Sequence, residues 1–259
     1  MRVRMLGTGS SDGWPNPWCR CRSCAAARTA GRIRRQTSAL VDGRLLIELG
    51  HDGVRAAVDL SAVEAVLVTH GHADHHAVPA WMWRGWAEGR RPLTLVAPPA
   101  VVADARSRLD DTVETVEVSP GDRLDVCGYD VRVLPATHAG RQVGPAVLYD
   151  LTSPEGARLL WATDTGILGP EALAMTENRA YDAVLLDLTG AHLPDHHDVT
   201  TWPTQISELR KRGAVLGSTA LHAIHLGHSN PPPAELDAVL AAWGASAPED
   251  GDELLVGSG

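Results

Sequence analysis

The feature that most constrains this chain is a group of imidazole and carboxylate side chains directly after a short apolar segment. The run Val66–Thr69 is typical of a buried strand, and His70-Gly71-His72-Ala73-Asp74-His75 follows it at once. Side chains placed where a strand ends are held by a rigid scaffold and still face a cleft. Imidazole together with carboxylate suits zinc, manganese or iron, and this many ligands in one short segment can supply two neighbouring ions. We therefore expect the chain to fold around a metal site at the end of this strand.

Three further candidate ligands also follow predicted strands: His138, Asp164 and His225. A solitary histidine is more often an ordinary residue than a ligand. As an ordered set with the 70–75 segment, however, five imidazoles and two carboxylates can hold two cations, with Asp164 bridging them. His222 is the alternative to His225. Because side chains alternate along a strand, His225 shares a face with Leu221, opposite His222, and we prefer His225.

A second group of possible metal ligands is the cysteine cluster Cys19-Arg20-Cys21-Arg22-Ser23-Cys24. Three thiolates this close need one more ligand to complete a tetrahedral structural zinc site, and a free or redox-active thiol cluster is the alternative. We expect His228 to be the fourth ligand. Cys127 is the rival, but it lies at a predicted strand end and turn, where we expect it to pack as a small apolar side chain.

Short apolar segments alternate with turn signals along the whole chain, which predicts two sheets covered by helices in one α/β-type domain. The predicted strands are 2–6, 38–41, 45–49, 65–69, 93–96, 113–118, 129–134, 146–150, 158–162, 183–187, 214–221 and 253–256. The predicted helices are 78–87, 100–109, 171–175, 201–212 and 233–243. A length of 259 residues is compatible with a single domain spanning 1–259.

Charge and composition narrow the class of protein. A formal net charge of -9 argues against a general nucleic-acid binder, which normally presents a basic surface. Pro98 and Pro99 interrupt the best candidate for a membrane-spanning segment. Clustered rather than dispersed cysteines, and a start (Met1–Gly7) without an apolar stretch of secretory length, predict a reducing cytoplasmic location.

With both groups of ligands identified, the chain resembles the metallo-β-lactamase superfamily. Within it, the chain is most similar to PhnP-type phosphodiesterases, which open phosphoribosyl 1,2-cyclic phosphate. The resemblance runs from about Met1 to Ser229. It rests on Gly7-Thr8-Gly9, Gly13-x-Pro15, Cys19-x-Cys21-x-x-Cys24, Arg34-Arg35-Gln36, the HxHxDH segment at 70–75 and His225-x-x-His228.

The resemblance implies a four-layer αββα sandwich with a two-metal site at one edge of its sheets, holding manganese or zinc. One ion would be bound by His70, His72 and His138, the other by Asp74, His75 and His225, with Asp164 between them. A separate structural zinc would be bound by Cys19, Cys21, Cys24 and His228. A hydroxide between the two ions would attack a small cyclic phosphodiester, with Asp74 and His197 as catalytic residues. The implied partners are a small-molecule substrate and, by analogy, a second copy of the chain. Neither a nucleic acid nor a membrane is expected as a partner.

Several points depart from the pattern or stay open. Glu48-Leu49-Gly50 stands where the superfamily usually has Asp-x-Gly, and a supporting role for that carboxylate would tolerate the longer side chain. His192 and His196 are alternatives to His197, and His51 is expected at the surface. Candidate phosphate contacts are Arg34, Arg35 and Arg141. Alternative functions are a PqqB-like cofactor-biosynthesis or redox protein and an RNA-processing nuclease of the same superfamily.

Overall fold

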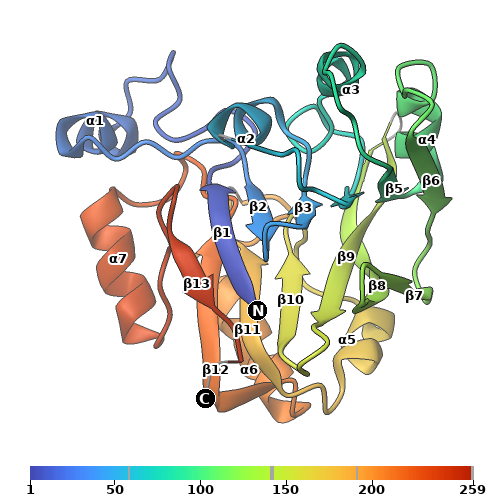
Figure 1. The fold of residues 1–259 in the computed structure, drawn as a ribbon. Helices are drawn as coiled ribbons and strands as arrows, with labels where there is room; N and C mark the ends of the chain where they lie inside the picture. The colour runs from blue at the N-terminus through green and yellow to red at the C-terminus, as the bar shows by residue number, and fades with distance from the viewer. Residues whose placement is uncertain (58, 141–142, 191, 258–259) are drawn as a thin grey trace.

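The computed structural model describes residues 1–57, 59–140, 143–190 and 192–257, and its strands form two sheets (Figure 1). The first sheet has the strand order β13-β1-β2-β3-β4-β5-β6. Its strands are β1 (Arg2–Gly7), β2 (Ser38–Val41), β3 (Leu45–Ile47), β4 (Ala65–Leu67), β5 (Leu93–Ala97), β6 (Val113–Glu117) and β13 (Glu253–Leu255). Strands β3 to β6 run parallel to one another, whereas β13, β1, β2 and β3 pair antiparallel.

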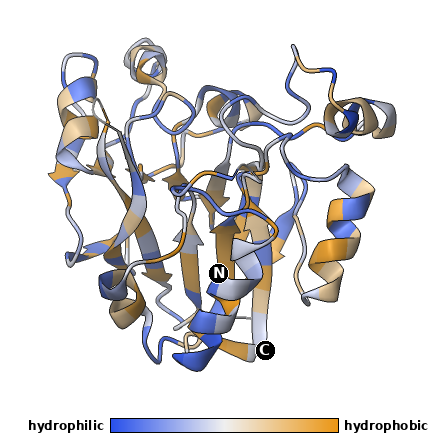
Figure 2. Ribbon diagram, turned by 180° about the vertical axis from the view of Figure 1, so that it is seen from behind, coloured by the Kyte–Doolittle hydropathy of each residue, from blue (hydrophilic) through white to orange (hydrophobic). Residues whose placement is uncertain are grey.

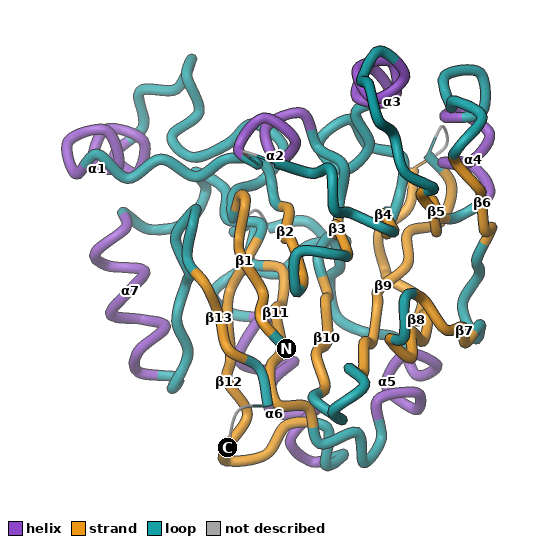
Figure 3. Tube along the Cα trace, in the orientation of Figure 1, coloured by secondary structure: helices purple, strands orange, loops and turns teal. Residues whose placement is uncertain are grey.

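The second sheet has the order β12-β11-β10-β9-β8-β7. It contains β7 (Arg123–Val126), β8 (Tyr129–Gly140), β9 (Gly144–Thr152), β10 (Arg158–Ala162), β11 (Tyr181–Asp187) and β12 (Val215–Ile224). Strands β10, β11 and β12 are parallel, so their carboxyl ends meet at one edge of the sheet. Figure 3 shows long loops gathered at the upper end of the sheets, towards which the arrow of β10 points in Figure 1.

Seven helices are seen among the described residues, and helices flank both sheets. They are α1 (Arg22–Ala30), α2 (His51–Ala56), α3 (Val78–Gly85), α4 (Pro99–Ala105), α5 (Pro170–Thr176), α6 (Thr201–Lys211) and α7 (Pro233–Ala242). In Figure 1, α2, α3 and α4 lie at the upper edge of the first sheet, whereas α5 and α6 lie by the second.

Three clusters of buried apolar side chains correspond to the three interfaces between layers. The central cluster joins the two sheets, with Ile47 and Leu67 from the first and Val133 and Leu159 from the second. A second cluster packs α5, α6 and α7 on the second sheet, and a third packs α3 and α4 on the first. Figure 2 shows this pattern as hydrophobic strands with mixed helices and loops around them. Burial of this kind contributes roughly 25 cal/mol per Å² of apolar area, so the layers are the main source of stability.

The predicted four-layer αββα architecture is confirmed. The pattern-based prediction missed β7, α1 and α2, and it ended β8 at Leu134 although the strand continues through Pro135 to Gly140. Strand β7 alternates charged and apolar residues at a sheet edge, and α2 is a single short helix with a glycine in its middle. No helix among the described residues has the length and apolar character needed to cross a membrane.

Candidate metal centre

One group of ligand atoms is contributed by the loop after β4, by β8 and by the loop after β10. His70 and His72 lie in the loop after β4, with His70 Nε2 at 2.8 Å from His72 Nδ1. His138 extends from an irregularity in the pairing of β8 with β9, and its Nε2 lies 3.1 Å from His72 Nδ1. The Oδ2 atom of Asp164, just after β10, is 3.4 Å from His70 Nε2 and 3.7 Å from His138 Nε2. All four side chains point an acceptor atom at the same small volume.

A second group shares one member with the first. Asp74 Oδ2 lies 3.0 Å from His75 Nε2 and 3.4 Å from the Nε2 atom of His225, which follows β12. The other oxygen of Asp164, Oδ1, is 3.3 Å from His75 Nε2 and 2.9 Å from His225 Nε2. The Asp164 carboxylate therefore presents one oxygen to each group, as a bridging ligand would.

These separations suit metal coordination. Two atoms bonded to one tetrahedral ion at about 2.0–2.2 Å lie about 3.3–3.6 Å apart. Both ring nitrogens of His75 and the Nδ1 atom of His138 are buried and make no hydrogen bond among the described residues, although a carboxylate oxygen lies 3.0–3.5 Å from each of them. Buried nitrogen atoms without partners are costly, and ligation of a cation would satisfy His75 Nε2. The donor set therefore fits two divalent ions.

The charges around these ligands also favour binding of divalent cations. Burial disfavours charging of the His75 and His225 imidazoles, yet the neighbouring carboxylates raise the pKa of both well above the usual value. Burial alone would raise the pKa of Asp164, but the His225 and His75 imidazoles hold it well below its usual range. Burial and the nearby His75 lower the pKa of His70 to about 4, so its imidazole is in the neutral form that binds metals. Dense negative charge beside neutral imidazole would stabilise a divalent cation.

The Glu48 carboxylate lies behind the expected metal ligand His75. This carboxylate is fully buried, accepts hydrogen bonds from the Thr69 backbone N–H (3.2 Å) and Trp161 Nε1 (3.3 Å), and lies 3.5 Å from His75 Nδ1. A carboxylate behind a ligating imidazole fixes the orientation of the ring and increases its basicity. The supporting role expected for this carboxylate therefore agrees with its position.

We expect Glu48→Gln to weaken binding of the ion held by His75 by roughly 10–100-fold, because the amide lacks the charge that faces His75 Nδ1. Titration of metal-free protein with Zn²⁺ or Mn²⁺ measures the change. Glu64→Gln, which alters an exposed carboxylate paired with Arg44, is the control. Equal affinity in both variants would contradict the role of Glu48.

Two further carboxylates, neither of them predicted from the sequence, lie behind other ligands. Asp187, the last residue of β11, lies with Oδ2 3.5 Å from His225 Nδ1 and 2.9 Å from His196 Nδ1. Burial alone would raise the pKa of Asp187, but these two imidazoles lower it to about 2. Asp195 Oδ2 lies 3.2 Å from His138 Nδ1. The position of Asp187 at a strand end, like that of Asp164, was the signal that could have identified it.

Three of the seven non-glycine residues with left-handed backbone among the described residues lie at this centre. Glu48, Asp164 and His225 all have positive φ, at 66°, 51° and 56°. Left-handed backbone is uncommon for residues other than glycine and costs roughly 1–2 kcal/mol per residue. Each of these residues lies one or two positions beyond the end of a strand, so the turn directs its side chain towards the centre rather than along the sheet.

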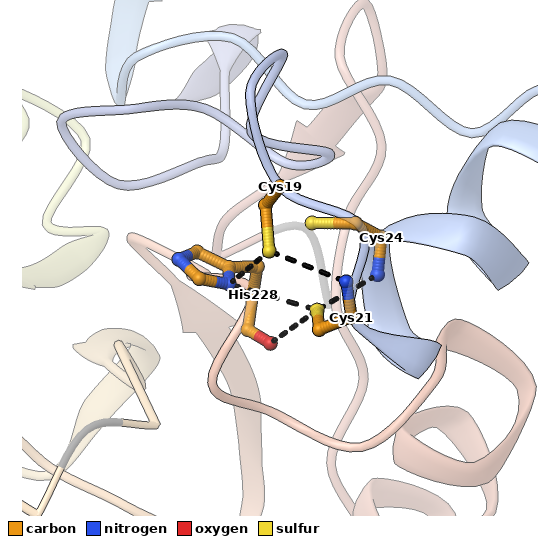
Figure 4. A group of neighbouring side chains, drawn as sticks. All are labelled: Cys19, Cys21, Cys24 and His228. Carbon is orange, nitrogen blue, oxygen red and sulfur yellow. Dashed lines mark hydrogen bonds between the residues drawn. The ribbon is translucent and has the colours of Figure 1, made fainter.

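The cysteine cluster forms a second possible metal site, separate from the first (Figure 4). Sγ of Cys19 lies 3.5 Å and Sγ of Cys21 3.7 Å from His228 Nδ1, and Cys24 completes the group. A tetrahedral zinc with sulfur and nitrogen ligands separates such atoms by about 3.6 Å. Cys21 caps the N-terminus of α1, where its sulfur accepts the Cys24 backbone N–H. Burial would raise the pKa of the Cys21 thiol, but that N–H and His228 lower it to about 6, which favours the thiolate.

A cavity of about 380 Å³ opens over the two-metal centre. His72, Asp74, His138, Asp164 and His225 line it together with His196. The candidate catalytic residues His196 and His197 differ in their position relative to this cavity. The side chain of His197 is fully buried, its Nδ1 lies 3.2 Å from Thr201 Oγ1, and His197 is not among the residues that line this cavity. The neighbouring residue, His196, takes the position at the cavity.

The remaining candidate histidines and the rival cysteine lie elsewhere. His192 is exposed and pairs with Asp198 at the N-terminus of α6. The Nδ1 atom of His222 lies 3.0 Å from Ser246 Oγ, and His222 belongs to no group of potential ligands among the described residues. His51 is exposed at the start of α2. Cys127 lies in the turn between β7 and β8, packed against the core between the sheets.

The arginines considered as phosphate contacts are not in the cavity where the structure describes them. Arg34 is buried and bonded to Thr8 and Glu249. Arg35 pairs with Asp250, through both its backbone N–H (2.7 Å) and its guanidinium (3.4 Å). Both residues therefore bond the 34–35 segment to residues 249–250, which precede β13, and Arg34 also bonds to Thr8. Arg141 lies outside the described residues.

Comparison with known protein families identifies the superfamily to which this arrangement of ligands belongs. The sequence model of the Beta-lactamase superfamily domain matches residues 46–240, which include all seven side chains of the two-metal centre. The chain belongs to the beta-lactamase superfamily. The resemblance at superfamily level is thus confirmed: this is a metallo-β-lactamase superfamily hydrolase with His and Asp clusters able to bind divalent metals.

Solved structures of the superfamily share the fold at low sequence identity. Zinc-bound PqqB from Methylobacterium extorquens matches with a TM-score of 0.78 and 22% identity, covering 98% of this chain and 100% of PqqB. A new diphosphatase from the PhnP family matches with a TM-score of 0.76 and 22% identity, covering 98% and 97%. Among curated proteins, the octanoyltransferase of Porphyromonas gingivalis is 36% identical over 80 residues, which span 29% of this chain and only 16% of that protein.

Proposed function

We propose that this superfamily hydrolase cleaves a small phosphodiester at the centre formed by the His70–His75 segment, His138, Asp164 and His225. The observation that carries the proposal is the Asp164 carboxylate, whose two oxygens serve two separate ligand groups that open into one cavity. Two-metal sites of this kind clamp both the attacking and the leaving oxygen of a phosphoryl displacement.

The size of the cavity supports a small substrate. A volume of about 380 Å³ lies at the lower end of the roughly 300–1,000 Å³ range of small-molecule sites. A formal net charge of -9 does not favour a folded RNA, whose binding depends largely on neutralised phosphates. The likeness to a diphosphatase of the PhnP family adds support for chemistry at phosphorus rather than at a carbonyl. As in the PhnP-like phosphodiesterases that the sequence resembles, a cyclic phosphodiester is the favoured substrate.

When bound, the two divalent ions supply Lewis acidity, which draws in phosphate oxygens and makes a water acidic at neutral pH. The side chains supply position and protons. His70, His72 and His138 would bind one ion, and Asp74, His75 and His225 the other, with Asp164 shared. His196 faces the cavity with its Nδ1 held by Asp187 at 2.9 Å, which leaves Nε2 to donate a proton to the departing oxygen. The Cys19, Cys21, Cys24 and His228 cluster would hold a structural zinc.

The proposal is tested by turnover of metal-loaded protein on bis(p-nitrophenyl) phosphate, a 2′,3′-cyclic nucleotide, a lactone, a thioester and a precursor tRNA. We expect both phosphodiesters to be hydrolysed with either Zn²⁺ or Mn²⁺, and elemental analysis to find two ions beyond one thiolate-bound zinc. Turnover of only the lactone, the thioester or the RNA would contradict the proposal.

Replacing His196 with Asn should lower kcat on bis(p-nitrophenyl) phosphate by roughly 10²–10⁴-fold, the usual contribution of a general acid. The matched variant His197→Asn removes an adjacent imidazole that does not line the cavity and should keep kcat within about threefold of the unmodified protein. Steady-state kinetics at saturating metal measure both variants, and metal analysis confirms equal loading. The reverse ranking would return the catalytic role to His197.

A further inference from the structure

One wall of the cavity comes from a turn rather than from the metal ligands. We call residues 10–13, which follow β1, the serine-aspartate turn. It is attached to the segment that carries His225. The Ser10 N–H donates to the Leu226 carbonyl (3.1 Å), and the Leu226 N–H donates to Thr8 (3.0 Å). A β-carbon on Gly227 would lie 3.1 Å from Ser10 Oγ and 2.7 Å from the Thr189 carbonyl oxygen, so only glycine allows this close approach. The turn therefore has a fixed position relative to the metal centre.

The carboxylate of Asp12 is held within this turn. Ser10 Oγ donates to Asp12 Oδ1 at 2.9 Å, and Asn16 Nδ2 donates to Oδ2 at 2.5 Å. His228 Nε2 lies 3.4 Å from the same Oδ2. The Asp12 side chain is about one third exposed (35%) and lines the cavity. Because these contacts leave acceptor positions on Oδ1 free, the carboxylate can still accept a hydrogen bond from a ligand.

Serine side chains around Asp12 carry hydroxyls that form hydrogen bonds. The cavity is lined there by Ser10, Ser11 and Ser229, whose hydroxyls both donate and accept hydrogen bonds. A fixed carboxylate among hydroxyls favours ligand groups that donate a hydrogen bond and opposes a second anionic group. Sugar or glycerol hydroxyls meet this requirement, whereas an additional phosphate does not.

We propose that the serine-aspartate turn is a hydroxyl-binding subsite, with Asp12 as its specificity-determining residue. This assignment rests on the proposed function, and it specifies the substrate class as phosphodiesters of neutral polyols without a second phosphate. A hydrogen bond from a ligand hydroxyl to a charged acceptor, rather than to a neutral one, accounts for a preference of roughly tenfold. Repulsion between the Asp12 carboxylate and a second phosphate opposes binding of a ligand that carries two phosphates.

The test measures equilibrium binding of three phosphomonoesters to metal-loaded protein by calorimetry. Glycerol 1-phosphate carries two hydroxyls, propyl phosphate has the same length without hydroxyls, and glycerol 1,3-bisphosphate carries a second phosphate. We expect glycerol 1-phosphate to bind about tenfold more tightly than either of the others. In Asp12→Asn, the preference over propyl phosphate should fall to about threefold or less, and the bisphosphate should bind more tightly than in the unmodified protein.

Opposite changes for the hydroxyl ligand and the bisphosphate are the signature of specificity, since general damage to the site would weaken all three ligands alike. Equal factors for all three, or unchanged Kd values, would overturn the inference. Glu155→Gln removes one negative charge from an exposed turn and should leave all three Kd values unchanged. Zinc content and Tm verify that the cysteine site, which includes His228, is intact, and Asp12→Ser repeats the test if Asp12→Asn loses that zinc.

The inference and the proposed function fail in different ways. Absence of turnover on bis(p-nitrophenyl) phosphate would contradict the phosphodiesterase but leave the three Kd values meaningful, because none of the three probes contains a phosphodiester bond. Normal turnover with unaltered ligand preference in Asp12→Asn would contradict only the subsite.

Discussion

An Asp164→Asn variant is expected to lose both active-site ions on dialysis and to lose at least about 10³-fold in kcat/KM on a phosphodiester. The reason is the number of acceptor atoms. The carboxylate offers Oδ2 to the His70 and His138 group and Oδ1 to the His75 and His225 group. An amide has only one oxygen, and its NH₂ would face the other group of imidazoles and exclude a cation there.

Elemental analysis after dialysis, together with steady-state kinetics, measures this effect. Asp111→Asn, which makes the same chemical change at an exposed residue, should keep both ions and full turnover. Two ions per chain in Asp164→Asn would mean that the carboxylate does not bridge, and the two-metal interpretation would then be wrong.

The second large effect is expected at the cysteine cluster. Cys24→Ser replaces a buried sulfur with a hard, weakly ligating hydroxyl. We expect loss of the structural zinc, about 3 kcal/mol or more of the free energy of unfolding, and a Tm lowered by about 6–12 °C. Zinc here would join the start of α1 to the His228 segment, and so restrict the unfolded chain across a very long loop.

Because His228 lies three residues beyond His225, the same variant should also reduce occupancy of the ion bound by His225. Thermal unfolding followed by circular dichroism, with metal analysis, measures both effects. Cys127→Ser makes the identical change in the turn between β7 and β8 and should shift Tm by less than about 4 °C. Equal shifts for the two variants would argue against a metal at the cysteine cluster.

Much of the fold was predictable because its strands are short, apolar and bounded by turn residues. Strands β2 and β10 have the predicted limits, and Asp164 and His225 were identified because each follows a predicted strand. Helix α1 was missed because its capping residue is Cys21, which was interpreted only as a ligand. The extension of β8 past Pro135 depends on an irregular pairing with β9 that leaves no local pattern.

The choice between His196 and His197 illustrates the limit of sequence alone. The two are adjacent, and the loop between β11 and α6 has no periodicity from which to infer a face. Only their tertiary contacts distinguish the two histidines. The Asp187 carboxylate lies 2.9 Å from His196 Nδ1, while His197 Nδ1 lies 3.2 Å from Thr201 Oγ1 at the start of α6. The supporting roles of Asp187 and Asp195 are likewise visible only once distant strands have met.

The left-handed backbone at Glu48, Asp164 and His225 has a practical consequence for engineering. Glycine adopts that conformation without a steric penalty, so its introduction at these positions would relieve roughly 1 kcal/mol each, against which the loss of buried contacts must be set. A directed-evolution campaign that rewards heat resistance alone places no selection against the loss of Asp164 or His225. Selection rounds need to alternate with an activity screen if the improved clones are to remain enzymes.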